Sequence, residues 1–112
     1  MPSETPVLDR VFKALSNPTR REVIARLGKG PAAMTELAKP FDMALPSFLQ
    51  HLQVLEKSGL VQSRKRGRVR VFQLEPRPLL EAEHWMDRRR REWKSRLDQL
   101  DLLLTQMKEE QE

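Results

Sequence analysis

Residues 35–74 decide the fold of this chain, and they read TELAKPFDMALPSFLQHLQVLEKSGLVQSRKRGRVRVFQL. A short helix is predicted over residues 35–38, because Pro40 ends it and a tight turn follows. A longer helix is predicted over residues 45–58, with Gly59 as its C-terminal stop. A short helix, a tight turn and a longer helix are the outline of a helix-turn-helix.

After Gly59 the periodicity changes from that of a helix to that of strands. Residues 60–61 and 69–74 have the β-branched, alternating character of strands, and Gly67 between them suits a hairpin turn. If the alternation holds, the hairpin cations share one face and the valines turn inward. The cations concerned are Arg66, Arg68 and Arg70, and the valines are Val69 and Val71.

Helices are also predicted on both sides of this region. Thr5-Pro6 and Asn17-Pro18 each place an N-cap side chain before a proline at the first helical position, and Gly28 ends the second helix. Residues 75–78 carry two prolines, which predicts a stiff linker. One long helix is then expected from residue 79 to about residue 107, because no Gly or Pro interrupts it.

These elements predict a mainly α fold with a small β-hairpin wing. Residues 1–78 would form a winged helix-turn-helix, and residues 79–112 a C-terminal dimerisation helix. Apolar residues recur along that helix in steps of four and three, which is typical of packing against another helix. We interpret both tryptophans there, Trp85 and Trp93, as packing residues, with an inducer pocket as the alternative. The expected dimer interface comprises Val7, Val11, Met86, Trp93, Leu97, Leu100, Leu104 and Met107.

The helix over residues 45–58 is expected to have two different faces. Its apolar side, which would pack on the preceding helices, consists of Leu45, Phe48, Leu52 and Leu55. Its polar side consists of Pro46, Ser47, Gln50, Gln53 and Lys57, with His51 at the margin. Glutamine can bond bidentately to adenine in the major groove. From this helix alone, contact with DNA bases and an ordinary solvated face are equally good interpretations of the polar side.

The segment after the helix favours nucleic acid. Five cations fall within seven residues without any acidic residue among them. Because like charges repel each other, such a cluster is best explained by binding to the phosphates of a nucleic acid. The predicted DNA-binding residues are therefore Ser47, Gln50, His51, Gln53, Lys57, Arg64, Lys65, Arg66, Arg68 and Arg70. A competing hypothesis is a helix-mediated protein-interaction module whose basic wing docks an acidic partner.

Composition excludes several other classes. The 112 residues carry a net charge of +5 with a pI near 10.1, and they contain no cysteine, so neither disulfides nor thiolate metal sites can form. No apolar run approaches the roughly 18 residues of a membrane span, and no secretory signal is apparent, so we expect a cytoplasmic protein. A Gly-rich phosphate loop and a catalytic constellation are also lacking, so neither an enzyme nor a cofactor is expected.

The chain resembles the ArsR family of bacterial winged-helix repressors. The resemblance rests on FKALSNPTR at residues 12–20, ELA at residues 36–38 and HLQVLEKSGLV at residues 51–61. It implies a homodimer that binds a palindromic operator in double-stranded DNA and represses transcription. It also implies release by an inducer, here an unknown small molecule or protein.

The chain departs from the family pattern in two places. Residues 32–37 read AAMTEL where metal-responsive members carry paired cysteines. The C-terminal helix offers only His84, with Glu81, Glu83 and Asp87 nearby, so no metal site is expected. The long helix of the helix-turn-helix starts with ALP at residues 44–46 instead of Ser or Thr, which leaves Asp42 or solvent to cap it.

Overall fold

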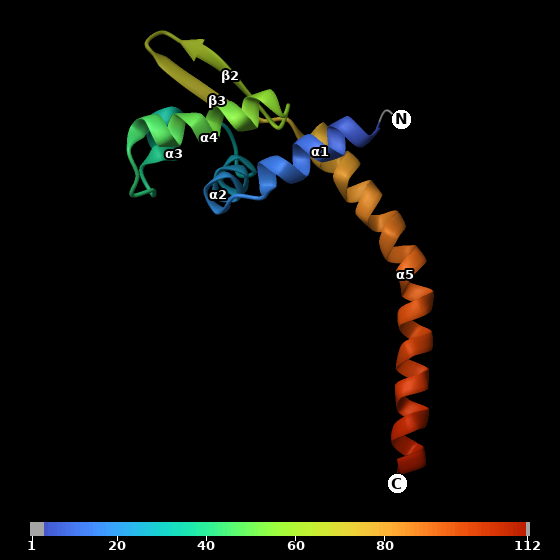
Figure 1. The fold of residues 1–112 in the computed structure, drawn as a ribbon. Coiled ribbons are helices and arrows are strands. Elements are labelled where there is room, and N and C mark those ends of the chain that lie inside the picture. The colour runs from blue at the N-terminus through green and yellow to red at the C-terminus, as the bar shows by residue number, and fades with distance from the viewer. Residues whose placement is uncertain (1–3, 112) are drawn as a thin grey trace. The chain divides into compact units, whose positions relative to one another are not determined.

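The computed structural model of the chain describes residues 4–111 (Figure 1). Its elements are α1 (Glu4–Leu15), α2 (Pro18–Leu27), β1 (Ala32–Ala33), α3 (Met34–Ala38), α4 (Leu45–Lys57), β2 (Val61–Arg66), β3 (Val69–Leu74) and α5 (Pro76–Gln111). They form two compact units, one ending at Ala82 and the other beginning at Glu83. The first unit holds every strand that the structure describes and the helix-turn-helix, so the mainly α fold with a basic hairpin is confirmed.

The first unit is built around a single apolar core. The helices α1 to α4 and all three strands of the sheet contribute to it, and its largest fully buried side chains are Phe48, Leu37, Leu52, Leu55, Leu60, Val11 and Val23. The Phe41 ring, from the turn before α4, packs on Phe48 with centroids 5.3 Å apart. The turn of the helix-turn-helix is thereby fixed on the helix that follows it.

N-caps were predicted at Thr5 for the first helix and at Asn17 for the second, and the structure describes only the second. Asn17 caps α2 as predicted, because its side-chain oxygen accepts a hydrogen bond from the Arg20 backbone N–H at 3.1 Å and Pro18 occupies the first turn. The helix α1 begins at Glu4, one residue before the predicted cap. The predicted cap of Thr5 lies outside the described side chains.

A third strand was not predicted. The two residues of β1 pair antiparallel with β3, Ala32 opposite Phe72 and Ala33 opposite Val71, which gives the sheet order β1-β3-β2. A two-residue strand has no periodicity to detect, and its pairing partner lies about forty residues further along the chain. The pairing fastens α3 to the sheet, because Met34 begins α3 directly after β1.

The predicted linker at residues 75–78 is wrong, because α5 already begins at Pro76. Both Pro76 and Pro78 lie in the first turn of the helix. The first backbone N–H groups of a helix have no intrahelical partner, so proline costs no hydrogen bond there. The wing therefore runs into α5 with only Glu75 between them, and the Glu75 N–H donates to the Leu60 carbonyl at 2.8 Å.

The junction between α4 and β2 is a tight helix C-terminus. Gly59 has a φ of +81°, its N–H donates to the Glu56 carbonyl at 3.0 Å, and the Leu60 N–H donates to the Leu55 carbonyl at 3.2 Å. These two bonds together form a Schellman motif, with Leu60 fully buried after it. The helix α4 therefore passes into β2 without a flexible linker.

We expect Gly59→Ala to lower the free energy of unfolding by about 1–2 kcal/mol, because a side chain at positive φ is strained. Glu56→Ala, an exposed change in the same turn, should alter it by less than about 0.5 kcal/mol. Urea unfolding of the three proteins measures both values. Equal stability of the Gly59 variant and the parent would contradict the assignment of strain.

Candidate nucleic-acid interface

The helix α4 has one buried side and one exposed side, as predicted. Phe48, Leu52 and Leu55 are at most 2% exposed and face the core. The prediction for Leu45 is wrong, because its side chain is 49% exposed. Leu45 is the first residue of α4, where the helix emerges from the turn and has no core element above it to cover the side chain.

The exposed side of α4 carries polar groups that are not engaged within the protein. Ser47, Gln50, Gln53 and Lys57 are all exposed, and none of them has a hydrogen-bond or ion-pair partner among the described residues. The Leu49 side chain on the same helix is 36% exposed. The amides and the hydroxyl remain available for a partner that offers both donors and acceptors, as base edges do.

No side chain caps the N-terminus of α4. Ala44 is the N-cap residue, and its carbonyl accepts the first helical bond from the Phe48 N–H at 3.1 Å. Asp42, the cap that the sequence suggested as one alternative, makes no such bond. The first turn of α4 is therefore left without a side-chain cap.

The prediction that the hairpin cations share one face is wrong, because the hairpin formed by β2 and β3 places them on both faces. The chain reverses at a two-residue loop that begins with Gly67 at a φ of +62°, so Arg66 pairs with Val69 and Arg64 pairs with Val71. Cross-strand partners share a face, so these two arginines stand with the two valines. Val69 does not turn inward but is 47% exposed. The predicted common face requires the alternation to continue unbroken through Gly67, and the turn there interrupts it.

The opposite face of the hairpin carries the remaining strand cations. Lys65 pairs with Arg70, on the same face as the buried Phe72 but beyond the edge of the core. The Arg70 guanidinium donates to the Ser63 hydroxyl at 2.8 Å, and Arg68 lies in the loop itself. All five cations are exposed, but they surround the hairpin tip and do not form a single row.

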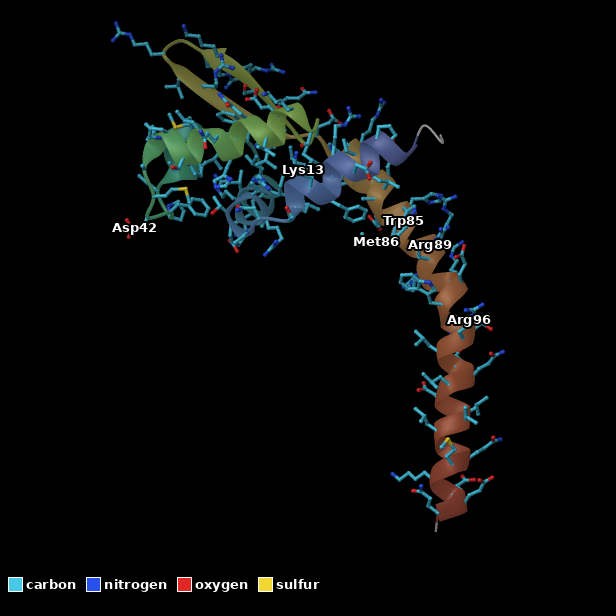
Figure 2. All side chains as sticks on the ribbon, in the orientation of Figure 1. Lys13, Asp42, Trp85, Met86, Arg89 and Arg96 are labelled. Atoms are coloured by element: carbon cyan, nitrogen blue, oxygen red, sulfur yellow. The ribbon has the colours of Figure 1, made fainter. Side chains whose placement is uncertain are left out.

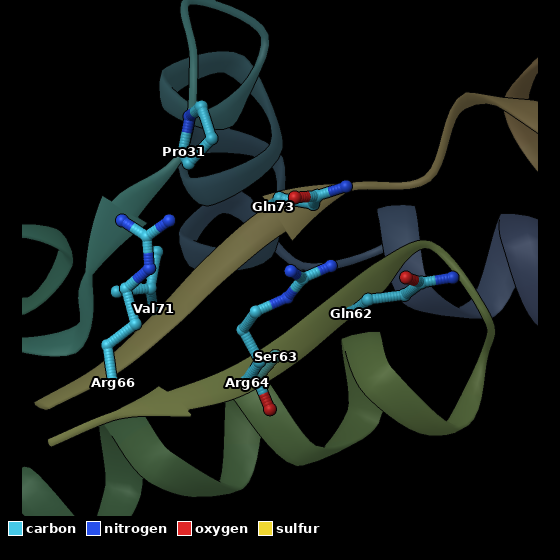
Figure 3. A pocket seen from close by; sticks show the side chains of 7 residues that line it. All are labelled: Pro31, Gln62, Ser63, Arg64, Arg66, Val71 and Gln73. Carbon is cyan, nitrogen blue, oxygen red and sulfur yellow. The ribbon is translucent and has the colours of Figure 1, made fainter.

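The outer face of the sheet forms a shallow basic groove. Figure 3 shows Arg64 and Arg66 of β2 on the face that also carries Val71 and Gln73 of β3. The full lining is Pro31, Gln62, Ser63, Arg64, Arg66, Val71 and Gln73. No acidic side chain contributes to this lining, so the groove suits an anionic backbone.

Arg20 is a residue of the site that the sequence did not point to. Its guanidinium donates to the Ala14 carbonyl at 2.7 Å and to the Lys13 carbonyl at 3.0 Å, at the end of α1. A third N–H lies 3.2 Å from Nδ1 of His51 on α4. One side chain of α2 thus ties α1 to α4, and it holds the half-buried His51 at the margin of the exposed face. Arg20 ends the stretch around Asn17-Pro18 that carries the family resemblance. That stretch does not show that Arg20 contacts His51.

The pKa of His51 lies below its usual value of 6.5, first because burial disfavours the charged ring and second because Arg20 is positive. The folded protein therefore holds the neutral ring, with Nδ1 accepting the bond from Arg20 and the proton on Nε2.

We expect this contact to make stability depend on pH. Because the folded pKa is lowered, the contribution is complete above pH 6.5 and is lost as the pH falls below 6.5 through the folded pKa. Urea unfolding at pH 7.5 and 5.5 tests this, with His51→Gln as the comparison. The loss of stability between the two pH values should be smaller in the variant, and an equal loss in both proteins would contradict the assignment.

The predicted apolar stripe of α5 is exposed. Met86, Trp93, Leu97, Leu100, Leu104 and Met107 are each between 48% and 58% exposed. Val11, in contrast, is fully buried in the core of the first unit and offers no surface to a partner, while Val7 packs half-buried against the same core. The exposed part of the expected dimer interface therefore lies on α5.

The arginine run on α5 is engaged in ion pairs within the helix. Arg90 and Arg91 both pair with Asp87, and Arg89 pairs with Glu92 at 3.2 Å. The Arg89 guanidinium also lies 5.3 Å from the centre of the Trp85 ring. Consecutive helical positions point in different directions, so the run does not form one tight patch.

The described residues provide no cluster for a metal ion. Within residues 4–111 no three His, Cys, Asp or Glu side chains converge on one point, and His84 with its neighbouring carboxylates is no exception. In the same range no helix is long and apolar enough to cross a membrane.

A helix-turn-helix followed by a three-stranded sheet with a basic hairpin defines a winged helix-turn-helix, a class of DNA-binding fold. Comparison with known proteins agrees with this class. Residues 15–64 match a family of helix-turn-helix domains. The chain is 41% identical over 80 residues to the HTH-type transcriptional regulator Rv2034 of Mycobacterium tuberculosis. The aligned stretch covers 71% of this chain and 75% of that protein.

Solved structures identify the family. An ArsR family transcriptional regulator of known crystal structure is 46% identical, with a TM-score of 0.78 over 85% of this chain and 98% of its own. A homodimeric winged helix-turn-helix DNA-binding domain from Mycobacterium bovis, described as a possible ArsR-family regulator, is 27% identical, with a TM-score of 0.60 over 79% of this chain and 83% of its own. The chain belongs to the ArsR family of helix-turn-helix transcriptional regulators.

Proposed function

We propose that the protein is a homodimeric repressor that binds a palindromic operator with α4 in the major groove. The observation that carries this proposal is the exposed side of α4, where Ser47, Gln50 and Gln53 have no partner among the described residues. Polar side chains that are exposed and unpaired suit the reading of base edges. Further support comes from a relative named as a transcriptional repressor, SdpR of Bacillus subtilis, which is 29% identical over 79 residues.

The predicted DNA contacts divide between α4 and the wing. We assign Ser47, Gln50, His51 and Gln53 to the bases, and Lys57 to a phosphate at the end of α4. The wing cations Arg64, Lys65, Arg66, Arg68 and Arg70 would bind the backbone or the adjacent minor groove. Because they surround the hairpin tip, they suit a wing that contacts DNA from more than one side.

The dimer follows from the exposed stripe of α5 in the second unit. A stripe of half-exposed large apolar side chains marks an interaction surface, and the similar domain from Mycobacterium bovis is described as homodimeric. We therefore propose residues 79–112 as the dimerisation helix. The protein would act in the cytoplasm, and a small molecule or a protein acting as inducer would release its DNA.

Selection from genomic DNA tests the proposed function. Purified protein is incubated with pooled genomic fragments at two salt concentrations, and the retained fragments are sequenced. We expect a few fragments that share an inverted repeat with half-sites about one helical turn apart. Indiscriminate binding that vanishes at the higher salt would refute operator recognition and would favour an acidic protein partner for the wing.

A further inference from the structure

All three nitrogens of the Arg20 guanidinium make contacts, and two of them are bound at the end of α1. Nε donates to the Ala14 carbonyl at 2.7 Å, and Nη2 donates to the Lys13 carbonyl at 3.0 Å. Figure 2 shows Lys13 near the carboxyl end of α1, where helical carbonyls lack a donor from within the helix. Because the guanidinium is planar and rigid, these two bonds fix its third nitrogen, Nη1, at 3.2 Å from Nδ1 of His51.

This contact determines which nitrogen of the His51 ring carries the proton. An arginine has only N–H donors and no acceptor, so the Nδ1 atom that faces it must accept. The neutral ring then has its single proton on Nε2. This Nε2 atom has no hydrogen-bond partner among the described residues, and it is not one of their buried atoms without a partner. It therefore offers a free N–H donor at the surface of α4.

His51 lies at the border between the two sides of α4. Gln50 before it is exposed, Leu52 after it is buried, and Ser47 precedes it by one turn on the same side. In the major groove, a side chain at the border of the reading helix lies nearer to the groove wall than to the middle of the base pair. Purine N7 is the base acceptor on that part of the edge, because guanine O6 and thymine O4 lie nearer to the middle. A single N–H donor from His51 therefore matches N7 of a purine.

We propose that Arg20 is a positioning residue for DNA reading, and that it holds His51 so that Nε2–H donates to N7 of a purine in the operator. The proposal rests on the operator binding of the proposed function and names the atom that His51 reads. Without Arg20 the ring is free to turn about its Cβ–Cγ bond and to exchange tautomers, so it would present either a donor or a lone pair to the base. A phosphate oxygen is the other acceptor near the groove wall, and binding to modified DNA distinguishes it from N7.

Nitrogen NMR of the histidine rings tests the positioning in the absence of DNA. The chain contains only two histidines, and the second, His84, is exposed on α5. At pH 8, where both rings are neutral, the nitrogen shifts of His51 should indicate a proton on Nε2 alone. Those of His84 should indicate a mixture of the two tautomers, as in a freely solvated ring. A proton on Nδ1 of His51, or a mixture like that of His84, would overturn the proposal.

Arg20→Gln removes the positioning group and should shift the His51 signals toward the mixture seen for His84. Arg21→Gln is the matched control. Arg21 donates to the Leu15 carbonyl at 2.8 Å, at the same end of α1, but within the described residues it makes no bond to His51. The His51 signals of this control should equal those of the parent. Unchanged His51 signals in Arg20→Gln would contradict the positioning role.

Two substitutions of His51 each keep one function of the ring. His51→Asn places an amide oxygen near the site of Nδ1, so it can still accept from Arg20 but cannot reach a base. His51→Gln places an amide N–H near the site of Nε2. In competition binding, the asparagine should lower the preference for operator over random DNA about thirtyfold, since both half-sites lose a hydrogen bond. The glutamine should lower it by at most about fivefold, and equal losses in the two variants would contradict the role of Nε2.

A double-mutant cycle shows whether Arg20 acts through His51. Arg20→Gln should lower the preference for operator about tenfold in the parent and should leave it unchanged in His51→Asn, which no longer contacts the base. The ratio of operator to random binding is independent of the folded fraction, so a loss of stability does not imitate the result. An equal decrease in both backgrounds would mean that Arg20 contacts DNA itself or acts through the fold, and the positioning role would be overturned.

Modified operators identify the acceptor that His51 contacts. In deazapurines a C–H group replaces N7 while base pairing stays intact. At one position of the half-site, this replacement should weaken binding of the parent and have no effect on His51→Asn. Uncharged methylphosphonates, placed one at a time in the backbone, examine the phosphates in the same way. If a methylphosphonate, and no deazapurine, loses its effect in His51→Asn, the contact is to phosphate and the assignment to N7 is overturned.

These measurements separate the inference from the proposed function. A protein that selects operator fragments, and whose His51→Asn variant prefers them as strongly as the parent does, would overturn only the contact of His51 with N7. A protein that selects no fragments would overturn the proposed function and the contact with it, whichever tautomer His51 shows.

Discussion

Gln50→Ala is expected to lower the preference for operator over random DNA by about a hundredfold. The Gln50 side chain is exposed on α4 and has no partner within the described protein, so its whole hydrogen-bonding capacity is available to a base. A bidentate contact contributes about 1–3 kcal/mol of discrimination, and a dimer makes it twice. Competition binding with labelled operator and unlabelled random DNA measures the ratio. Gln99→Ala, an exposed glutamine on α5, is the matched control and should leave the ratio unchanged.

Arg66→Ala should behave differently from Gln50→Ala. Arg66 is an exposed cation beside the basic groove and is assigned to phosphate, so its removal should weaken binding to operator and to random DNA about equally. It should also reduce the slope of log K against log salt by about two, because each of the two protomers loses one phosphate contact. Equal losses of specificity in the two variants would refute the division between base-reading helix and phosphate-binding wing.

Phe48→Ala is expected to destabilise the first unit by about 3–5 kcal/mol. Phe48 is 1% exposed, and its ring contacts Phe41, so truncation leaves a cavity between α4 and the turn that precedes it. Domains of this size have roughly 5–15 kcal/mol of stability in total, so the variant should be close to unfolding at 37 °C.

The neighbouring Leu49→Ala is the control for Phe48→Ala. Leu49 is 36% exposed, beside the polar side of the helix, and we expect a decrease in stability of at most about 1 kcal/mol. Urea unfolding of both variants gives the comparison. A decrease below about 1.5 kcal/mol for Phe48→Ala would mean that the turn can collapse onto the vacated space.

The elements that the sequence predicts correctly are those with a repeating pattern. The apolar spacing of α4, the cap at Asn17 and the glycine stop at Gly59 each follow from residues a few positions apart, and the structure confirms them. The apolar spacing of α5 is of the same kind: the structure confirms the helix, and its pairing with a partner stays a prediction. Local rules suffice for these features because the interactions that form them are themselves local.

The features that the sequence did not predict depend on residues far apart or on where the chain turns. The link between Arg20 and His51 joins positions 31 residues apart, and β1 becomes a strand only through its pairing with β3. The faces of the wing arginines depend on the reversal at Gly67, because a strand's alternation restarts after a turn. The exposure of Leu45 likewise depends on how the turn delivers the chain to α4.

The direct junction at Gly59 and Leu60 also has a consequence for motion. The Leu60 N–H is bonded to the last turn of α4, and the Leu60 carbonyl accepts the bond from Glu75 at the end of the wing. Neither α4 nor the hairpin can open locally without breaking these shared bonds, so the two should exchange their amide hydrogens as one cooperative unit. A single opening event would then expose both DNA-reading elements together, and the protein would hold its helix and its wing at a fixed spacing throughout the lifetime of the folded state.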